Sequence, residues 1–109
     1  MARPSGVVTF LFTDIEGSTR LWEEHPDAMR TASARHDVIL NSAIEAHRGR
    51  VFSTSGDGLA AAFDRAGDAI AAALAAQRAM AAEPWPEPIE MLVRFGIHTG
   101  EADERGGDF

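Results

Sequence analysis

The first residue with chemical promise is Asp14, which closely follows an apolar run from Val7 to Phe12. A run of β-branched and aromatic residues predicts a buried strand. Asp14 would stand at its carboxyl end, where α/β folds commonly bind ligands. A Gly-Ser-Thr turn at 17–19 leads into a helical pattern, and the free N–H groups of a helix start favour phosphates. A carboxylate beside such an anion site suits magnesium or manganese, because these cations prefer oxygen ligands.

A second acidic residue, Asp57, lies in the stretch Ser55-Gly56-Asp57-Gly58 between two short strand patterns. Glycine and aspartate between such patterns indicate a hairpin turn, with Asp57 at its tip. If this hairpin lies beside the first strand, Asp14 and Asp57 can face one another. Two carboxylates can hold two metal ions in a phosphoryl or nucleotidyl transfer site.

Each of these residues also has an ordinary structural role open to it. Asp14 can be a simple strand-end carboxylate, and Asp57 can be one of the turn residues that hairpins favour. Ser18 and Thr19 are residue types that cap helices, and a cap is compatible with phosphate binding by backbone N–H groups. The four histidines form no ligand cluster by spacing, so none is assigned a catalytic role.

The bulk composition narrows the function classes. The chain has 109 residues, 45% of them hydrophobic, so we expect one small domain with a packed core over residues 1–109. A formal net charge of −7 argues against a nucleic-acid partner but is compatible with a free nucleotide that carries its own metal. Cysteine and lysine are both absent. No apolar stretch is long enough to span a membrane and no signal-peptide pattern precedes Val7, so we expect a cytoplasmic protein.

The predicted elements run in the order β-α-β-β-α-β. Strands are expected at residues 6–13, 50–53, 59–63 and 91–99. The first helix is expected in two pieces, 18–24 and 27–47, because Pro26 suits the first turn of a new helix. The second is expected at 65–82 with Asp64 as its N-cap. This is the order of the ferredoxin-like α+β sandwich, an antiparallel sheet with helices on one face. Because the chain stops soon after a strand, we expect a domain that is incomplete at its C-terminus.

Apolar periodicity predicts the buried helix faces. In the helix at 27–47, one face carries Met29, Ala32, His36, Ile39, Leu40, Ala43, Ile44 and His47. In the helix at 65–82, the equivalent stripe is Ile70, Leu74, Gln77 and Met80 or Ala81. Gly49 is the expected C-cap residue of the longer helix. Alternation along 91–99 places Arg94 on the face opposite Val93 and Phe95, where we expect a structural or interface role.

Three stretches together resemble the catalytic domain of class III adenylate/guanylate cyclases, in its bacterial form. They are Phe12-Thr-Asp-Ile-Glu-Gly-Ser-Thr19, Ser55-Gly-Asp-Gly58 and Arg94-Phe-Gly-Ile-His-Thr-Gly-Glu101. The resemblance covers residues 6–109, and the chain looks like the first three-fifths of that domain. It implies the βαββαβ core and the conversion of ATP or GTP to a 3′,5′-cyclic nucleotide and pyrophosphate, in signal transduction.

The resemblance also implies roles for individual residues. Asp14 and Asp57 match the two metal-binding aspartates, and the Ile15 carbonyl matches a backbone metal ligand. Residues Glu16, Gly17, Ser18 and Thr19 match the turn whose backbone contacts the triphosphate. Two Mg²⁺ or Mn²⁺ ions per site are implied, as is a head-to-tail homodimer with its active sites at the subunit interface.

Two departures from the family pattern bear on activity. Ser53 stands where the common pattern has a lysine that reads the purine, and serine carries no charge, so base discrimination is expected to be weaker or different. The asparagine and arginine that stabilise the transition state would lie after Phe109. We therefore expect the 109-residue chain alone not to cyclise nucleotide at a useful rate. The alternative is a degenerate cyclase-homology module that regulates or dimerises.

Overall fold

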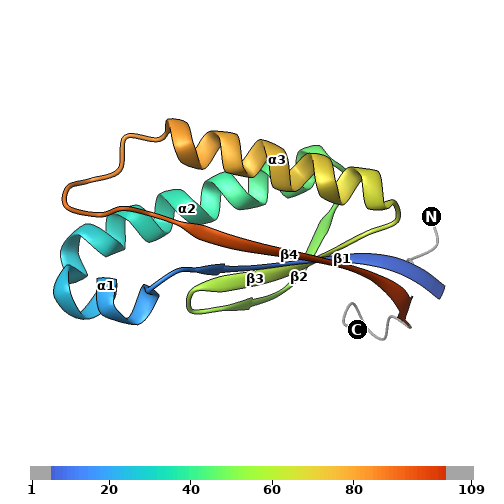
Figure 1. Ribbon diagram of the computed structural model, residues 1–109, viewed down its shortest axis with the longest axis horizontal. Helices are drawn as coiled ribbons and strands as arrows, with labels where there is room; N and C mark the ends of the chain where they lie inside the picture. Colours follow the sequence, from blue (N-terminus) through green and yellow to red (C-terminus); the bar gives the residue numbers. More distant parts are fainter. Residues whose placement is uncertain (1–5, 103–109) are drawn as a thin grey trace.

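Two long helices lie across one face of a four-stranded sheet in the computed structural model, which describes residues 6–102 (Figure 1). The elements are, in chain order, β1 (Gly6–Ile15), α1 (Ser18–Glu24), α2 (Pro26–Ala46), β2 (Arg50–Ser55), β3 (Gly58–Phe63), α3 (Ala66–Ala82) and β4 (Val93–Ala102). The sheet order is β2-β3-β1-β4, and every neighbouring pair is antiparallel. The ferredoxin-like α+β prediction is confirmed; the chain end at Phe109 lies outside the described residues.

The central strand β1 is longer than the sequence predicted. It pairs with β3 on one side and with β4 on the other, and its ladder with β4 continues to the pair Ile15–Val93. Asp14 therefore lies inside the strand, opposite Gly58 of β3 and Arg94 of β4. The site residue is held by two neighbouring strands rather than at a free strand end.

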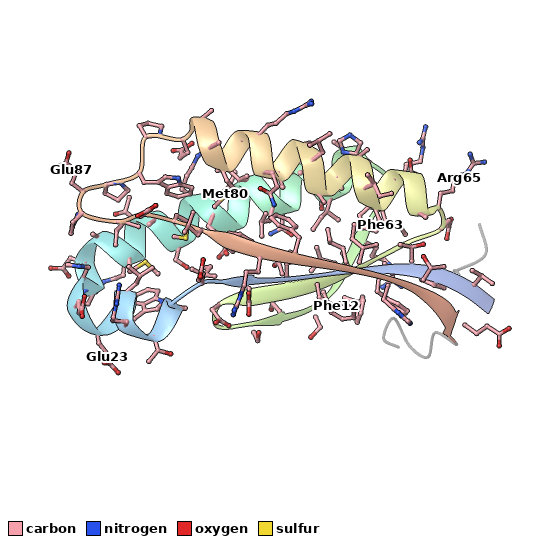
Figure 2. The ribbon with its side chains drawn as sticks, in the orientation of Figure 1. Phe12, Glu23, Phe63, Arg65, Met80 and Glu87 are labelled. Atoms are coloured by element: carbon pink, nitrogen blue, oxygen red, sulfur yellow. The ribbon has the colours of Figure 1, made fainter. Side chains whose placement is uncertain are left out.

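The core fills the space between the helices and one face of the sheet. Leu11 of β1 packs in one buried cluster with Leu40 of α2 and Phe63 of β3, and Ile15 joins a second cluster that contains Met80 of α3. Phe63 and Met80 lie between the layers, whereas Phe12 lies on the far side of the sheet (Figure 2). Because Leu11 and Ile15 are buried against the helices, they fix the position and orientation of the strand that carries Asp14.

The burial of the two long helices follows the predicted period only in α2. Its predicted face is buried from Met29 to Ile44, with seven of the eight predicted positions in the core. In α3 the prediction is confirmed for Met80 but wrong for Gln77, which is exposed, and for Ile70 and Leu74, which are 57% and 48% exposed. The buried positions of α3 are Ala69, Ala72, Ala76 and Met80. Small side chains face the sheet because they let the helix backbone approach it closely, so residue size was a misleading guide.

Most elements have an end that differs from the prediction by one to three residues. Helix α3 begins at Ala66 with Arg65 in the N-cap position, and no side chain caps it, so Asp64 is not the cap. Strand β4 begins at Val93, two residues later than expected, and continues to Ala102, three residues further than expected. Strand β2 extends to Ser55, with a register shift between Val51 and Ser53. These shifts leave the order and pairing of the elements unchanged.

At the end of α2 the residue in the left-handed conformation is Arg48, one position before the expected Gly49. Arg48 has φ 64°, and the Gly49 N–H donates to the Ile44 carbonyl at 2.9 Å. This is the Schellman pattern, with arginine in the position usually held by glycine. Gly49 is needed for another reason: a Cβ there would overlap the ring of Phe63 and lie 2.6 Å from Cγ2 of Ile44.

Replacing Gly49 with alanine should destabilise the domain by about 2 kcal/mol, the usual cost of overpacking a filled core. The Phe63 ring is only 1% exposed and has little room to move. Gly67→Ala is the matched control, because a Cβ there meets nothing within 4 Å and alanine favours helix. Urea unfolding of both variants measures the difference. Equal stability of the two variants would contradict this account of Gly49.

In the part of the chain that the structure describes, no helix has the length and apolar character needed to cross a bilayer.

Candidate functional site

Asp14 projects from the sheet face that the helices leave open. Its neighbours Thr13 and Ile15 are buried toward the helices, and Asp14 itself is half-buried on the opposite side. The guanidinium of Arg94 donates to both of its oxygens, Nε to Oδ1 at 2.8 Å and Nη2 to Oδ2 at 2.7 Å. Sequence reasoning gave Arg94 no role at the site. Its face was predictable from alternation, but the β1–β4 register that aligns it with Asp14 was not.

The electrostatics of the site centre on Arg94. The hydrogen bond from Arg94, and then its positive charge, hold the pKa of Asp14 below its usual value despite partial desolvation. The pKa of Arg94 is raised by its hydrogen bond to Asp14 and by the charges of Asp14, Glu16 and Asp57. Of these three carboxylates Arg94 contacts that of Asp14 alone, while the negative charges of Glu16 and Asp57 act on it from a greater distance, so the site has an excess of negative charge.

The hairpin brings Asp57 next to the strand that carries Asp14, as the sequence predicted. Asp57 lies in the turn between β2 and β3, and its backbone carbonyl accepts a 2.9 Å hydrogen bond from the Ile15 N–H. The following residue, Gly58, allows the close approach, because a Cβ there would overlap the Thr13 carbonyl oxygen. Asp57 is thus fastened to the backbone beside Asp14.

The turn after β1 is arranged differently from the predicted cap. Gly17 is the N-cap of α1 in the left-handed conformation, with φ 67°, and no side chain caps the helix. Ser18 is the first helical residue and is buried, so neither Ser18 nor Thr19 is a cap. The Glu16 N–H is already used by the Leu92 carbonyl at 2.8 Å.

A shallow hollow joins this turn to the hairpin tip. Its lining consists of Ser18, Thr19, Trp22, Glu23, Gly56 and Asp57. A separate depression over β1 and β4 contains Asp14 and Arg94 together with Phe12, Thr13, Phe95 and Gly96. The predicted phosphate-binding turn and both candidate metal-binding aspartates are therefore neighbours at one end of the sheet.

Ser53 is set apart from this group. It is exposed on the edge strand β2 and pairs with Ala60, which in turn pairs with Phe12. This cross-strand row lies on the open face of the sheet, where Phe12 is 47% exposed. The predicted base-reading position is thus on the same face as Asp14, but two residues before the end of β2.

The donor set fits magnesium or manganese. Asp14 and Asp57 offer carboxylate oxygens. Ile15, which follows Asp14, offers its backbone carbonyl oxygen as a further ligand. Among residues 6–102 no three acidic or histidine side chains are grouped to hold an ion by themselves. Magnesium commonly uses one or two carboxylates and completes its shell with water and substrate phosphates. The bound Arg94 guanidinium shows that a cation is accommodated at the Asp14 carboxylate.

The family model described as "Adenylate and Guanylate cyclase catalytic domain" matches residues 1–105, so the chain belongs to that family. A relative in Mycobacterium tuberculosis, itself uncharacterized, is 44% identical over 94% of this chain and 34% of its own length. An adenylate cyclase of Lachancea kluyveri is 38% identical over 92% of this chain and 6% of its own length. The chain thus spans about a third or less of these two relatives.

A solved structure from the adenylate cyclases of Trypanosoma brucei, in their monomeric state, has the same fold. It superimposes with a TM-score of 0.87 at 28% identity, over 96% of this chain and 61% of the solved chain. The sheet that carries Asp14 and Asp57 is therefore the sheet of the cyclase domain.

Proposed function

We propose that this chain provides the metal- and phosphate-binding part of a class III nucleotide cyclase domain, which converts ATP or GTP to a 3′,5′-cyclic nucleotide and pyrophosphate. The observation that carries the proposal is the hydrogen bond between Ile15 and Asp57, which holds the second aspartate against the strand that presents the first. Membership of the cyclase family supports the reaction class.

In this proposal the carboxylates of Asp14 and Asp57 and the carbonyl of Ile15 hold two Mg²⁺ or Mn²⁺ ions. When bound, the metal pair supplies Lewis acidity at the ribose 3′ hydroxyl and the α-phosphate. The turn of residues 16–19, which leads into α1 beside the hairpin tip, receives the triphosphate through the N–H groups of residues 17–19, because that of Glu16 is bonded to the Leu92 carbonyl. Arg94 adds a positive charge beside Asp14.

Ser53 is the proposed base-reading position. Its hydroxyl can make one hydrogen bond to a purine edge but cannot contribute charge, so the preference for ATP or GTP should be modest. An exposed place on the open sheet face suits contact with a nucleotide held at a subunit interface. We propose that residues 1–109 form part of one such domain and that it acts as a homodimer.

The superimposed part of the chain, 96% of its length, covers 61% of the solved Trypanosoma chain. We propose that the 109 residues bind metal and nucleotide but do not cyclise it, because the remaining residues of the catalytic site belong to the other part of the domain. A regulatory or dimerising cyclase-homology module is the second candidate, and the serine at position 53 favours it.

Fluorescent ATP and GTP analogues test the proposal, by titration with the chain in Mn²⁺ and in EDTA. We expect binding that depends on the metal, a small difference between the two purines, and no cyclic nucleotide detectable by mass spectrometry. Binding that is equal in EDTA would contradict the metal site. Efficient product formation by the chain alone would contradict the proposed division of the catalytic residues.

A further inference from the structure

The Asp14–Arg94 pair occupies the carboxylate that the proposed function assigns to a metal ion. Both oxygens of Asp14 accept a hydrogen bond from the same guanidinium, at 2.8 and 2.7 Å. This fork-to-fork geometry is the strongest form of the arginine–carboxylate pair. It lies across strands β1 and β4, whose register sets the two residues opposite one another. The pair is therefore built into the sheet.

Other negative charges near the site also favour the position of Arg94 beside Asp14 in the metal-free protein. Its charge is favoured by Glu16 and Asp57 as well as by Asp14. The guanidinium neutralises the charge of Asp14 and so reduces its repulsion from Glu16 and Asp57, as a bound metal ion would. Its side chain is 66% exposed, so solvent leaves it room to move away from Asp14.

We propose that Arg94 is a built-in competitor of the metal ion: it holds Asp14 in the metal-free protein and leaves that carboxylate when the metal binds. The inference rests on the proposed function, because it takes Asp14 to be a metal ligand. A divalent ion at Asp14 meets oxygens that already face a guanidinium, and the two cations repel one another at such short range. Arg94 therefore sets the metal affinity of the site.

The size of the effect follows from the stability of the pair. An exposed ion pair of good geometry is populated over its broken form by up to about fivefold. A ligand that needs the broken form binds more weakly by the fraction of protein that is competent. Removal of the Arg94 charge should therefore tighten the binding of metal alone by about fivefold, more if repulsion persists after displacement.

Mn²⁺ binding without nucleotide, measured by electron paramagnetic resonance, tests this inference in the wild type and in Arg94→Met. We expect about fivefold tighter binding in Arg94→Met and an intermediate affinity in Arg94→Lys, which keeps the charge but loses the fork. Arg30→Met is the matched control: it removes an equal charge from an exposed pair, in which Arg30 lies 2.8 Å from Asp27 on α2. The control should bind like the wild type.

The outcomes separate the inference from the function on which it rests. If the wild type binds Mn²⁺ and Arg94→Met binds it with the same or a lower affinity, the competition is overturned but the metal site is not. Absence of Mn²⁺ binding in every protein at millimolar concentration overturns both. A nuclear magnetic resonance titration of the wild type with Mg²⁺ gives a direct readout that needs no variant. The Nε–H signal of Arg94 should shift with metal occupancy, and a signal that is unchanged at saturation contradicts displacement.

Discussion

Replacing Gly58 with alanine should destabilise the domain by about 3 kcal/mol and lower its melting temperature by roughly 10–20 °C. A Cβ at this position would overlap the backbone carbonyl oxygen of Thr13, which cannot rotate away as a side chain can. Relief requires that β3 move away from β1, at the rung that pairs Gly58 with Asp14. The same movement would strain the hydrogen bond from Ile15 to Asp57, so metal binding should weaken as well.

Gly56→Ala is the control for this prediction, because it adds the same methyl group two residues away in the same hairpin. A Cβ at Gly56 meets nothing within 4 Å. Calorimetric melting should therefore show a change within about 0.5 kcal/mol for this variant. If the two alanine variants melt together, the close contact between the hairpin and β1 does not hold Asp57 in place.

Asp14→Asn should reduce the affinity for Mn²⁺ by at least about 100-fold, because the loss of a direct ligand exceeds the 10- to 100-fold cost of losing its outer-shell partners. Asparagine keeps the shape of the side chain but removes its charge. The melting temperature should change little, because the Arg94 side chain is exposed and can turn to solvent. Equilibrium dialysis against Mn²⁺ measures the affinity.

Asp27→Asn is the matched control for the loss of a carboxylate. Asp27 is 93% exposed on α2, where it pairs with Arg30, and it belongs to neither hollow of the site. This variant should retain wild-type Mn²⁺ affinity. An Asp14→Asn protein that still binds Mn²⁺ as the wild type does would remove Asp14 from the metal site.

The order and type of the elements could be predicted from sequence because local signals agreed with the tertiary structure. The apolar run of β1, the turn at Gly56-Asp57 and the proline at the start of α2 each act within a few residues. The stripe of α3 failed because its alanines, not Ile70 and Leu74, face the sheet. How closely a helix backbone approaches the sheet is set by tertiary packing, and the periodicity of side chains in the sequence does not predict it.

The candidate site was only partly predictable for a similar reason. The hairpin signal was sufficient to place Asp57 at a tip, and the strand pattern was sufficient to place Asp14 near its end. The ion pair of Asp14 with Arg94 depends on the register of two strands separated by 80 positions in the chain. Ser18 is not a cap for a local reason: Gly17 adopts the left-handed conformation and takes the N-cap position, so Ser18 is already the first helical residue.

Calorimetric titration of ATP and GTP in the presence of Mn²⁺, with the wild type beside Asp57→Ala, tests the central claim most directly. The account predicts that the wild type binds nucleotide only with metal and that Asp57→Ala loses this binding while it keeps the wild-type circular dichroism spectrum. Nucleotide binding that is the same in both proteins, or that needs no metal, would contradict a metal-dependent nucleotide site at Asp14 and Asp57.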